Sequence, residues 1–295
     1  MKDKIVVITG SNSGIGRVAA TEIAKMGAQV IMVCRNEAKA KAVQEDINAV
    51  TGLNNCDLFI CDFSSHASIK QFAKAIRMKY NQIDVLINNA GVIIGEREEN
   101  EEGMEMMFAT NHLGYFLVTH YLLDLLKASD KARIVSVASL AHRFTNMKWN
   151  NLQGEQSFNS WIQYGHTKLM NILFNKELAY QLKKNTNITA NCLHPGNINS
   201  NFGQSGNPLM KFLMSNFGFV LTTPEKGAET TIYLATSPEV QGKTGLYWYS
   251  KNPTFPSLEA ISSENSRRLW EISHKLSGVK EFGVVNLENS AFSTV

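Results

Sequence analysis

Residues 5–17 read IVVITGSNSGIGR, and this stretch determines the expected fold. The apolar run Ile5 to Ile8 is typical of a buried strand, and a helical pattern begins directly after the last glycine. Glycine is needed where a turn takes unusual backbone angles or where the main chain approaches a pyrophosphate, whose charge the next helix N-terminus stabilises. The stretch therefore predicts a phosphate-binding turn between a strand and a helix, with a plain strand-to-helix turn as the alternative. The residues expected to contact a nucleotide here are Gly10, Ser11, Asn12, Ser13, Gly14, Ile15 and Gly16.

Short apolar runs and longer amphipathic segments alternate along most of the chain. The apolar runs predict strands at 5–8, 29–33, 58–60, 84–87, 133–137 and 188–192. The amphipathic segments predict helices at 14–26, 37–50, 65–80, 102–127 and 162–184. This order predicts an α/β fold, a Rossmann-type doubly wound parallel sheet in a single domain with helices on both faces.

The later part of the chain has a different composition, because all six prolines fall at or after Pro195. We expect residues 1–250 to form the dinucleotide-binding and catalytic domain, including an apolar substrate-loop segment at 197–223. Residues 251–295 are expected to form a C-terminal extension, with one helix at 262–276 and a tail. The apolar face of Leu209 to Val220 suits a lid over an apolar pocket, or equally a surface helix that packs on the core.

Bulk composition excludes several classes of protein. The chain has 295 residues with 44% hydrophobic content, and its 29 Lys and Arg are dispersed among 26 acidic residues, so no nucleic-acid partner is expected. The chain enters a strand almost at once, and no apolar run reaches the ~18 residues that a spanning helix needs, so a cytoplasmic protein without a membrane span is expected. The cysteines lack CxxC spacing, which predicts buried thiols in a reducing compartment and no metal site. They are Cys34, Cys56, Cys61 and Cys192.

The end of the second predicted strand bears on which dinucleotide binds. In dinucleotide folds an acidic residue about 20 residues beyond the glycines holds the ribose 2′-hydroxyl of NAD. Cys34 and Arg35 occupy that place, and an arginine can pair with a 2′-phosphate that a carboxylate would repel. The sequence therefore favours NADP over NAD, with Arg17 as a further positive charge, although Glu37 lies nearby and Arg35 could simply face solvent.

A tyrosine and a lysine stand one helical turn apart in the stretch YGHTK, as Tyr164 and Lys168. Residues at i and i+4 lie on the same face of a helix, so the ammonium can lower the pKa of the phenol from its usual value of about 10. Such a phenol can donate or accept a proton. The pair therefore predicts acid–base chemistry next to the bound nucleotide.

Together these motifs resemble the short-chain dehydrogenase/reductase superfamily over about residues 4 to 250. The similar stretches are TGSNSGIG (9–16), Asp62, NNAG (88–91), YGHTK (164–168) and HPG (194–196). The stretches CR (34–35), NHLGYF (111–116), RIVSVASLAH (133–142) and HPG are similar to the retinol dehydrogenase-like branch.

The resemblance implies roles for individual residues. Tyr164 is implied as the acid–base group, Lys168 as its partner, Ser139 as the hydroxyl that stabilises developing charge on the substrate oxygen, and Asn111 as the holder of a water. Considered one at a time, each residue has an alternative role. Tyr164 and Lys168 could simply form an amphipathic helix face, Ser139 could cap a strand end, and Asn111 could make a contact at a helix kink. The remaining cofactor contacts implied by the resemblance are Asp62, Phe63, Asn89, Ala90, Gly91, Pro195, Gly196, Ile198 and Ser200. Asp62 could instead cap the next helix and NNAG could be a strand-ending turn, while His142 and His166 are expected to support the site rather than to react.

The expected function is hydride transfer between NADP(H) and a hydrophobic aldehyde, ketone or alcohol, as in a carbonyl reductase or a retinol dehydrogenase-like enzyme. One alternative is a catalytically silent protein of the same fold that senses nucleotides, and a second is a membrane-surface or interaction role through Leu209 to Val220. The large apolar faces expected at 111–127 and 164–184 are surfaces that commonly pair subunits in this superfamily. A homodimer is therefore possible unless the C-terminal tail covers one of them.

Overall fold

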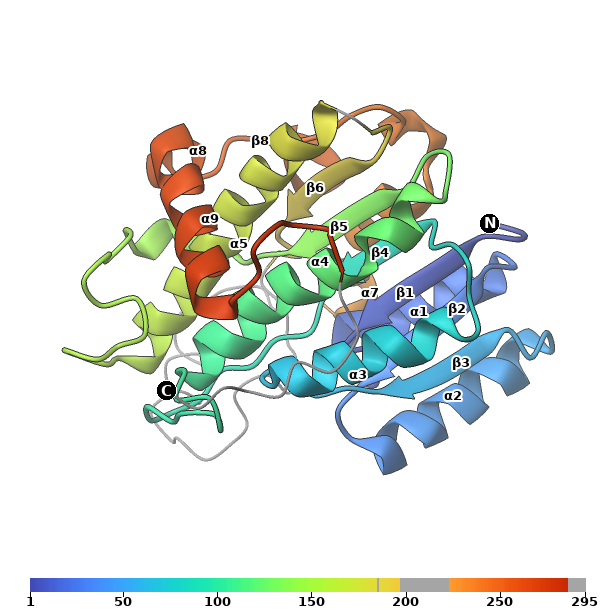
Figure 1. Ribbon diagram of the computed structural model, residues 1–295. Coiled ribbons are helices and arrows are strands. Elements are labelled where there is room, and N and C mark those ends of the chain that lie inside the picture. The colour runs from blue at the N-terminus through green and yellow to red at the C-terminus, as the bar shows by residue number, and fades with distance from the viewer. Residues whose placement is uncertain (185, 197–222, 286–295) are drawn as a thin grey trace.

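A computed structural model of the protein describes residues 1–184, 186–196 and 223–285. Within this part of the chain one sheet of eight strands runs in the order β3-β2-β1-β4-β5-β6-β7-β8 (Figure 1). All neighbouring strands are parallel except β7 and β8, which pair antiparallel. The strands are β1 (Ile5–Thr9), β2 (Gln29–Cys34), β3 (Cys56–Ile60), β4 (Val85–Asn88), β5 (Arg133–Val137), β6 (Thr189–Leu193), β7 (Tyr247–Tyr249) and β8 (Asn252–Thr254). The predicted doubly wound parallel sheet is confirmed.

Helices cover both faces of this sheet (Figure 1). The α-helices are α1 (Gly14–Lys25), α2 (Glu37–Thr51), α3 (His66–Arg77), α4 (Gly114–Lys127), α5 (Ser160–Lys183), α7 (Pro224–Thr236), α8 (Leu258–Ile261) and α9 (Ser263–Ser277). A π-helical turn, η1 (Phe108–Leu113), precedes α4, and the 3-10 turns are η2 (Leu140–Phe144) and η3 (Pro238–Val240).

The central strands are buried on both sides because their side chains alternate between two cores. In β1, Val6 and Ile8 pack with α1, α2 and α7, whereas Val7 packs with α3, α4 and α5. This explains why Ile5–Thr9 is continuously apolar rather than alternating. The order of the strands reverses direction between β1 and β4, so the carboxyl ends of these strands form the crevice where this architecture binds ligands.

The helix expected at 102–127 begins later than predicted. Glu105 accepts hydrogen bonds at 2.8 Å from the main-chain nitrogens of Met107 and Phe108, and so caps the helical segment. Residues 101–104 form a turn that includes Gly103 at φ +72°. The apolar periodicity extended across this turn and did not reveal it. Helix α7 was also missed, although its start is marked in the sequence by Thr223, which caps Lys226, followed by Pro224.

The C-terminal part of the described chain packs on α4 and α5. Phe116 of α4 lies 5.3 Å from the ring of Trp270 on α9 and 4.9 Å from that of Phe282. Phe174 of α5 stacks on the same tryptophan at 5.9 Å. Part of the apolar surface that was expected to pair subunits is thus buried within one chain. The homodimer and the division of the chain at residue 250 stay predictions.

All four cysteines are buried and free, as expected. None of the helices within the described ranges is long and apolar enough to cross a membrane. The cytoplasmic location stays a prediction.

Candidate active site

The glycine turn follows β1 at the crevice. Gly10 has φ +66°, and a Cβ atom there would lie 2.7 Å from the main chain of Ala90, so only glycine fits. Gly16 is equally confined, because its Cβ would lie 2.5 Å from the side-chain nitrogen of Asn89. By contrast, a Cβ on Gly14 would meet no atom of the described chain within 4 Å. One side of the turn is therefore closed by the protein, and the other is open.

The NNAG segment after β4 holds this turn in place. The main-chain nitrogens of Asn89 and Ala90 each donate to the hydroxyl of Thr9 at 2.9 Å. The Asn89 amide donates to the carbonyls of Thr9 and Gly10 at 2.8 and 3.0 Å. These bonds give Asn89 a role in shaping the turn, and contact of Asn89, Ala90 and Gly91 with a ribose stays a prediction.

Helix α1 presents its N-terminus to the open side of the turn. Ser13 is the N-cap residue of α1, but within the described part of the chain its side chain accepts no capping hydrogen bond. The first turn of α1 carries no acidic residue. Its first main-chain N–H groups and the positive end of its dipole are thus left for an anion. Ser11 is buried and lies 3.4 Å from the sulfur of Cys34, which joins the turn to the end of β2.

Arg35 and Asp62 meet at the rim beyond β2 and β3. Their charged groups lie 3.8 Å apart, and the arginine side chain is 65% exposed, so it is accessible to a ligand. The other oxygen of Asp62 accepts from the main-chain nitrogen and hydroxyl of Ser64, so this carboxylate does cap the turn before α3. Arg17 pairs with Asp46 at 3.1 Å. The ring of Phe63 lies in the core, which leaves only its main chain for a cofactor.

Ser139, Tyr164 and Lys168 converge at the carboxyl end of β5. A hydrogen bond from the Ser139 side chain reaches the phenol of Tyr164. The ammonium of Lys168 lies 5.6 Å from the centre of the Tyr164 ring and donates to the carbonyl of Val137 at 3.1 Å. Close packing allows this meeting, because a Cβ on Gly165 would lie 2.8 Å from the carbonyl of Ala141. The three side chains therefore share one site.

The pKa of Tyr164 is raised in this structure, which is opposite to the direction expected from Lys168 alone. Burial raises that pKa to about 12, and the hydrogen bond from Ser139 lowers it by a smaller amount. Burial also lowers the pKa of Lys168 to about 8. Burial thus disfavours the charged form of both groups, the phenolate of Tyr164 and the ammonium of Lys168. Near neutral pH the phenol is protonated and can serve as a proton donor.

Asn111 lies in the π-helical turn η1 and is completely buried. Its side chain accepts from the nitrogen of Val92 at 2.8 Å and donates to the carbonyl of Val92 and to the hydroxyl of Thr167. The side chain thus ties the segment after β4 to helix α5. A contact at a helix kink was the alternative role expected of Asn111 from the sequence, and the structure has such a contact. A water held by Asn111 stays a prediction.

Comparison with known proteins agrees with this arrangement of turn and side chains. Residues 4–209 match the short chain dehydrogenase family. The chain belongs to the short-chain dehydrogenase family.

This short-chain dehydrogenase is 38% identical to human retinol dehydrogenase 11 over 276 residues, which cover 94% of the chain and 86% of that relative. The resemblance to the retinol dehydrogenase-like branch is thereby confirmed. The crystal structure of an uncharacterised protein from Mycobacterium paratuberculosis is similar with a TM-score of 0.76 and 28% identity, covering 94% of both chains. A short chain dehydrogenase from Shigella flexneri, complexed with NADP, has a TM-score of 0.66 and 26% identity over 85% of this chain and 98% of its own.

Two buried histidines lie within three residues of Ser139 or Tyr164 in the sequence. His142 contacts the carbonyl of Ser139 at 2.7 Å, and His166 accepts from the main-chain nitrogen of Lys148 at 3.0 Å. Burial lowers the pKa of each to about 4, so both are neutral at physiological pH. Tyr247, which the sequence did not single out, contacts both His142 and His194, a residue noted only as part of the HPG stretch. Tyr247 was missed because its strand has only three residues, although the aromatic run YWY favours a strand.

Pro195 and Gly196 follow β6 at the same edge of the sheet, and Gly196 has φ +87°. Ile198, Ser200 and the apolar stretch Leu209 to Val220 lie outside the described residues. The cofactor contacts expected of Ile198 and Ser200, and the lid over an apolar pocket expected of Leu209 to Val220, stay predictions.

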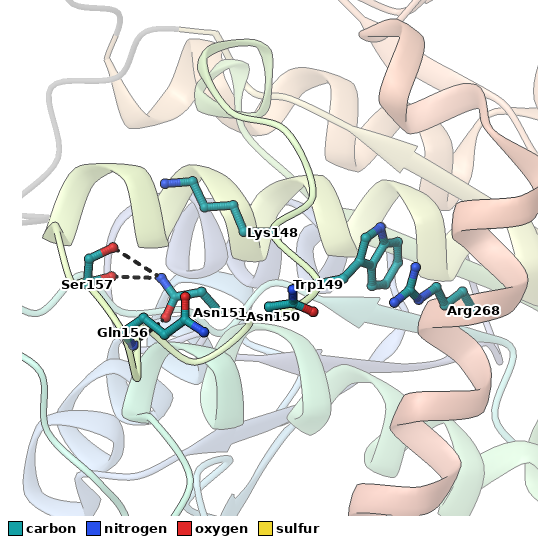
Figure 2. Close-up of a pocket in the computed structure, with 7 residues that line it drawn as sticks. All are labelled: Lys148, Trp149, Asn150, Asn151, Gln156, Ser157 and Arg268. Atoms are coloured by element: carbon teal, nitrogen blue, oxygen red, sulfur yellow. Dashed lines mark hydrogen bonds between the residues drawn. The ribbon is translucent and has the colours of Figure 1, made fainter.

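A polar hollow of about 600 Å³ lies between the 148–157 segment and α9 (Figure 2). Trp149 forms one wall, with the guanidinium of Arg268 at 4.4 Å from its ring. Asn151 donates to Ser157 and is committed to the shape of the segment. The residues lining the hollow include neither Ser139 nor Tyr164, so it is separate from the site that those residues share with Lys168.

Proposed function

We propose that this oxidoreductase transfers hydride between NADP(H) and a hydrophobic aldehyde, ketone or alcohol. The observation that carries the proposal is the convergence of Ser139, Tyr164 and Lys168 at the edge of the sheet that also bears the glycine turn. NADPH would supply the hydride when bound. The chain's own residues would bind that cofactor, donate the proton and stabilise the charge that develops on the substrate oxygen.

The cofactor-binding part of the proposal is supported by the open side of the glycine turn and by the uncapped α1. A pyrophosphate there would receive the free N–H groups of the helix. The preference for a 2′-phosphate is supported by Arg35, because its side chain is 65% exposed and so accessible to a ligand. The related Shigella flexneri protein is complexed with NADP.

The catalytic part rests on two hydroxyl groups. Tyr164 would give its proton to the substrate oxygen, and the raised pKa keeps that proton in place near neutral pH. Ser139 would donate a hydrogen bond to the same oxygen as negative charge develops. Lys168, held by the carbonyl of Val137, would bond the nicotinamide ribose and so connect the cofactor with the acid.

A hydrophobic substrate is supported by Trp161, one helical turn before Tyr164. Its ring lies 6.0 Å from that of the tyrosine, and 46% of the residue is exposed. It therefore presents an apolar surface beside the phenol. The relatives named retinol dehydrogenases suggest retinal-like aldehydes among the compounds to try first.

The test is a screen of NADPH oxidation with aldehydes and ketones of graded size and polarity, with NADH run in parallel. We expect the highest kcat/KM with large apolar carbonyl compounds and NADPH. A preference for small charged keto acids would refute the substrate class, and NADH rates equal to or above the NADPH rates would refute the cofactor. Binding of NADPH without turnover of any carbonyl compound would favour the silent nucleotide-sensing alternative.

A further inference from the structure

The hydroxyl of Tyr247 lies between two buried histidines that belong to neighbouring strand ends. It is 2.8 Å from Nδ1 of His194, which follows β6, and 3.4 Å from Nδ1 of His142, which follows β5. The tyrosine is 5% exposed, and His142 and His194 are 0% and 6% exposed. The ring of His194 also stacks between those of Tyr247 and Tyr249, with its centre 5.4 and 4.3 Å from theirs. We call His142, His194 and Tyr247 the His–Tyr–His cluster.

The neighbours of His142 determine where its proton lies. Its Nε2 accepts from the main-chain N–H of Ser257 at 3.2 Å, so that nitrogen carries no proton. Its Nδ1 lies 2.7 Å from the carbonyl of Ser139, which can only accept, so Nδ1 carries the proton and donates it. The Tyr247 oxygen is a second, more distant acceptor for the same proton. The hydroxyl proton of Tyr247 is then free to be donated to Nδ1 of His194.

This assignment requires both imidazoles to be neutral, and their surroundings agree with that. Burial lowers the pKa of His142 and of His194 to about 4. Burial also raises the pKa of Tyr247, which keeps its hydroxyl protonated. The cluster is thus a chain of neutral donors and acceptors with one consistent direction, and each member fixes the orientation of the next.

The chain of bonds ends on the main chain of Ser139. The carbonyl of this residue is held by His142, while its hydroxyl accepts from the nitrogen of Ala141 at 3.2 Å and contacts Tyr164. We propose that Tyr247 is a positioning residue: its hydroxyl holds His142 and His194, and through His142 it sets the place of the Ser139 hydroxyl. The inference rests on the proposed carbonyl reduction, in which a displaced hydroxyl no longer meets the developing charge.

The kinetic test is Tyr247→Phe, which removes one oxygen and keeps the ring that stacks on His194. We expect kcat for carbonyl reduction to fall about 10-fold, with the Kd of NADPH unchanged within twofold. The loss is smaller than the roughly 10²- to 10³-fold that complete removal of an oxyanion donor costs, because the Ser139 hydroxyl is displaced rather than removed. The matched control is Tyr249→Phe, which removes a hydroxyl from the other tyrosine stacked on the same histidine. A kcat within twofold of the unsubstituted protein in Tyr247→Phe, or an equal loss in Tyr249→Phe, would overturn the proposal.

A double-mutant comparison separates positioning from general weakening of the fold. In a Ser139→Ala background no hydroxyl remains to be positioned, so adding Tyr247→Phe should change the residual kcat less than twofold. The same 10-fold loss in both backgrounds would show that Tyr247 acts elsewhere, and the proposal would fail.

The ring nitrogens give a readout that does not depend on activity. With ¹⁵N-labelled histidine, NMR of the unsubstituted protein should show the proton on Nδ1 of His142 and on Nε2 of His194, with the His194 Nδ1 resonance shifting in Tyr247→Phe. A proton on Nε2 of His142 would refute the network. If the unsubstituted protein oxidises no NADPH, the proposed function fails, and the NMR pattern still decides whether the His–Tyr–His cluster exists.

Discussion

Replacing Tyr164 by phenylalanine tests the catalytic proposal most directly. The change removes only the phenolic oxygen, and it keeps the ring beside Trp161 and Lys168. General acid catalysis by one positioned group is worth about 10²- to 10⁴-fold. Burial raises the pKa of Tyr164 to about 12, so at pH 7 nearly every molecule has this proton available and nearly all of that factor depends on it.

We therefore expect kcat to fall about 10³-fold in Tyr164→Phe, which corresponds to about 4 kcal/mol of transition-state stabilisation. Ser139 remains to stabilise the substrate oxygen, so residual turnover is expected. The free energy of unfolding should fall by only about 1 kcal/mol, because one hydrogen bond is lost and no cavity larger than an oxygen is created.

The assay is single-turnover oxidation of NADPH with a large apolar aldehyde, together with fluorescence titration of NADPH binding. Tyr180→Phe is the matched control, because Tyr180 lies on the same helix and is 57% exposed. Full activity in Tyr164→Phe would refute the mechanism. A parallel loss of NADPH binding would show that the tyrosine acts in binding rather than in proton donation.

Three further predictions concern charge, cofactor and backbone. Burial lowers the pKa of Lys168 from 10.5 to about 8, so between these pH values the unfolded chain binds more protons than the folded chain. This group therefore makes the free energy of unfolding rise with pH from about 8 to 10.5. The rise, up to about 3 kcal/mol, should disappear in Lys168→Met when urea unfolding is followed across this range, and an unchanged pH dependence would contradict it. Arg35→Ala should raise the Kd of NADPH about 10- to 100-fold and leave the Kd of NADH nearly unchanged. Arg17→Ala is the control, because Arg17 is already paired, and it should raise the Kd of NADPH much less. Equal losses of affinity for both nucleotides in Arg35→Ala would argue against a 2′-phosphate contact. Gly10→Ala should destabilise the protein by more than Gly52→Ala in urea unfolding, since both glycines have φ near +65° but only the first would place its Cβ against main chain, at 2.7 Å; equal costs of about 1 kcal/mol would refute the close-approach argument.

Local sequence spacing determined the architecture and much of the candidate site. The turn at 9–16 needs glycine because of backbone angles and close approach, and these demands are visible in the sequence itself. Tyr164 and Lys168 share a helix face because helical geometry places i and i+4 together. The alternation of apolar runs and amphipathic segments determined a parallel sheet, because only that arrangement buries strands on both faces.

Tertiary structure alone decided what surrounds those residues. The pKa of Tyr164 depends on burial by segments distant in sequence, and the sequence-based expectation therefore had the wrong direction. The pairing of Arg35 with Asp62 also escaped prediction, and only the structure showed that the contact of Asn111 at a helix irregularity lies in a π-helical turn.

The contact of Tyr247 with His142 joins residues 105 positions apart. Periodicity and spacing report a residue's relation to its neighbours within a few turns of chain. Hydrogen bonds across the sheet depend on how the strands are ordered, and desolvation depends on everything packed around a group, so both become defined only when the whole chain has folded.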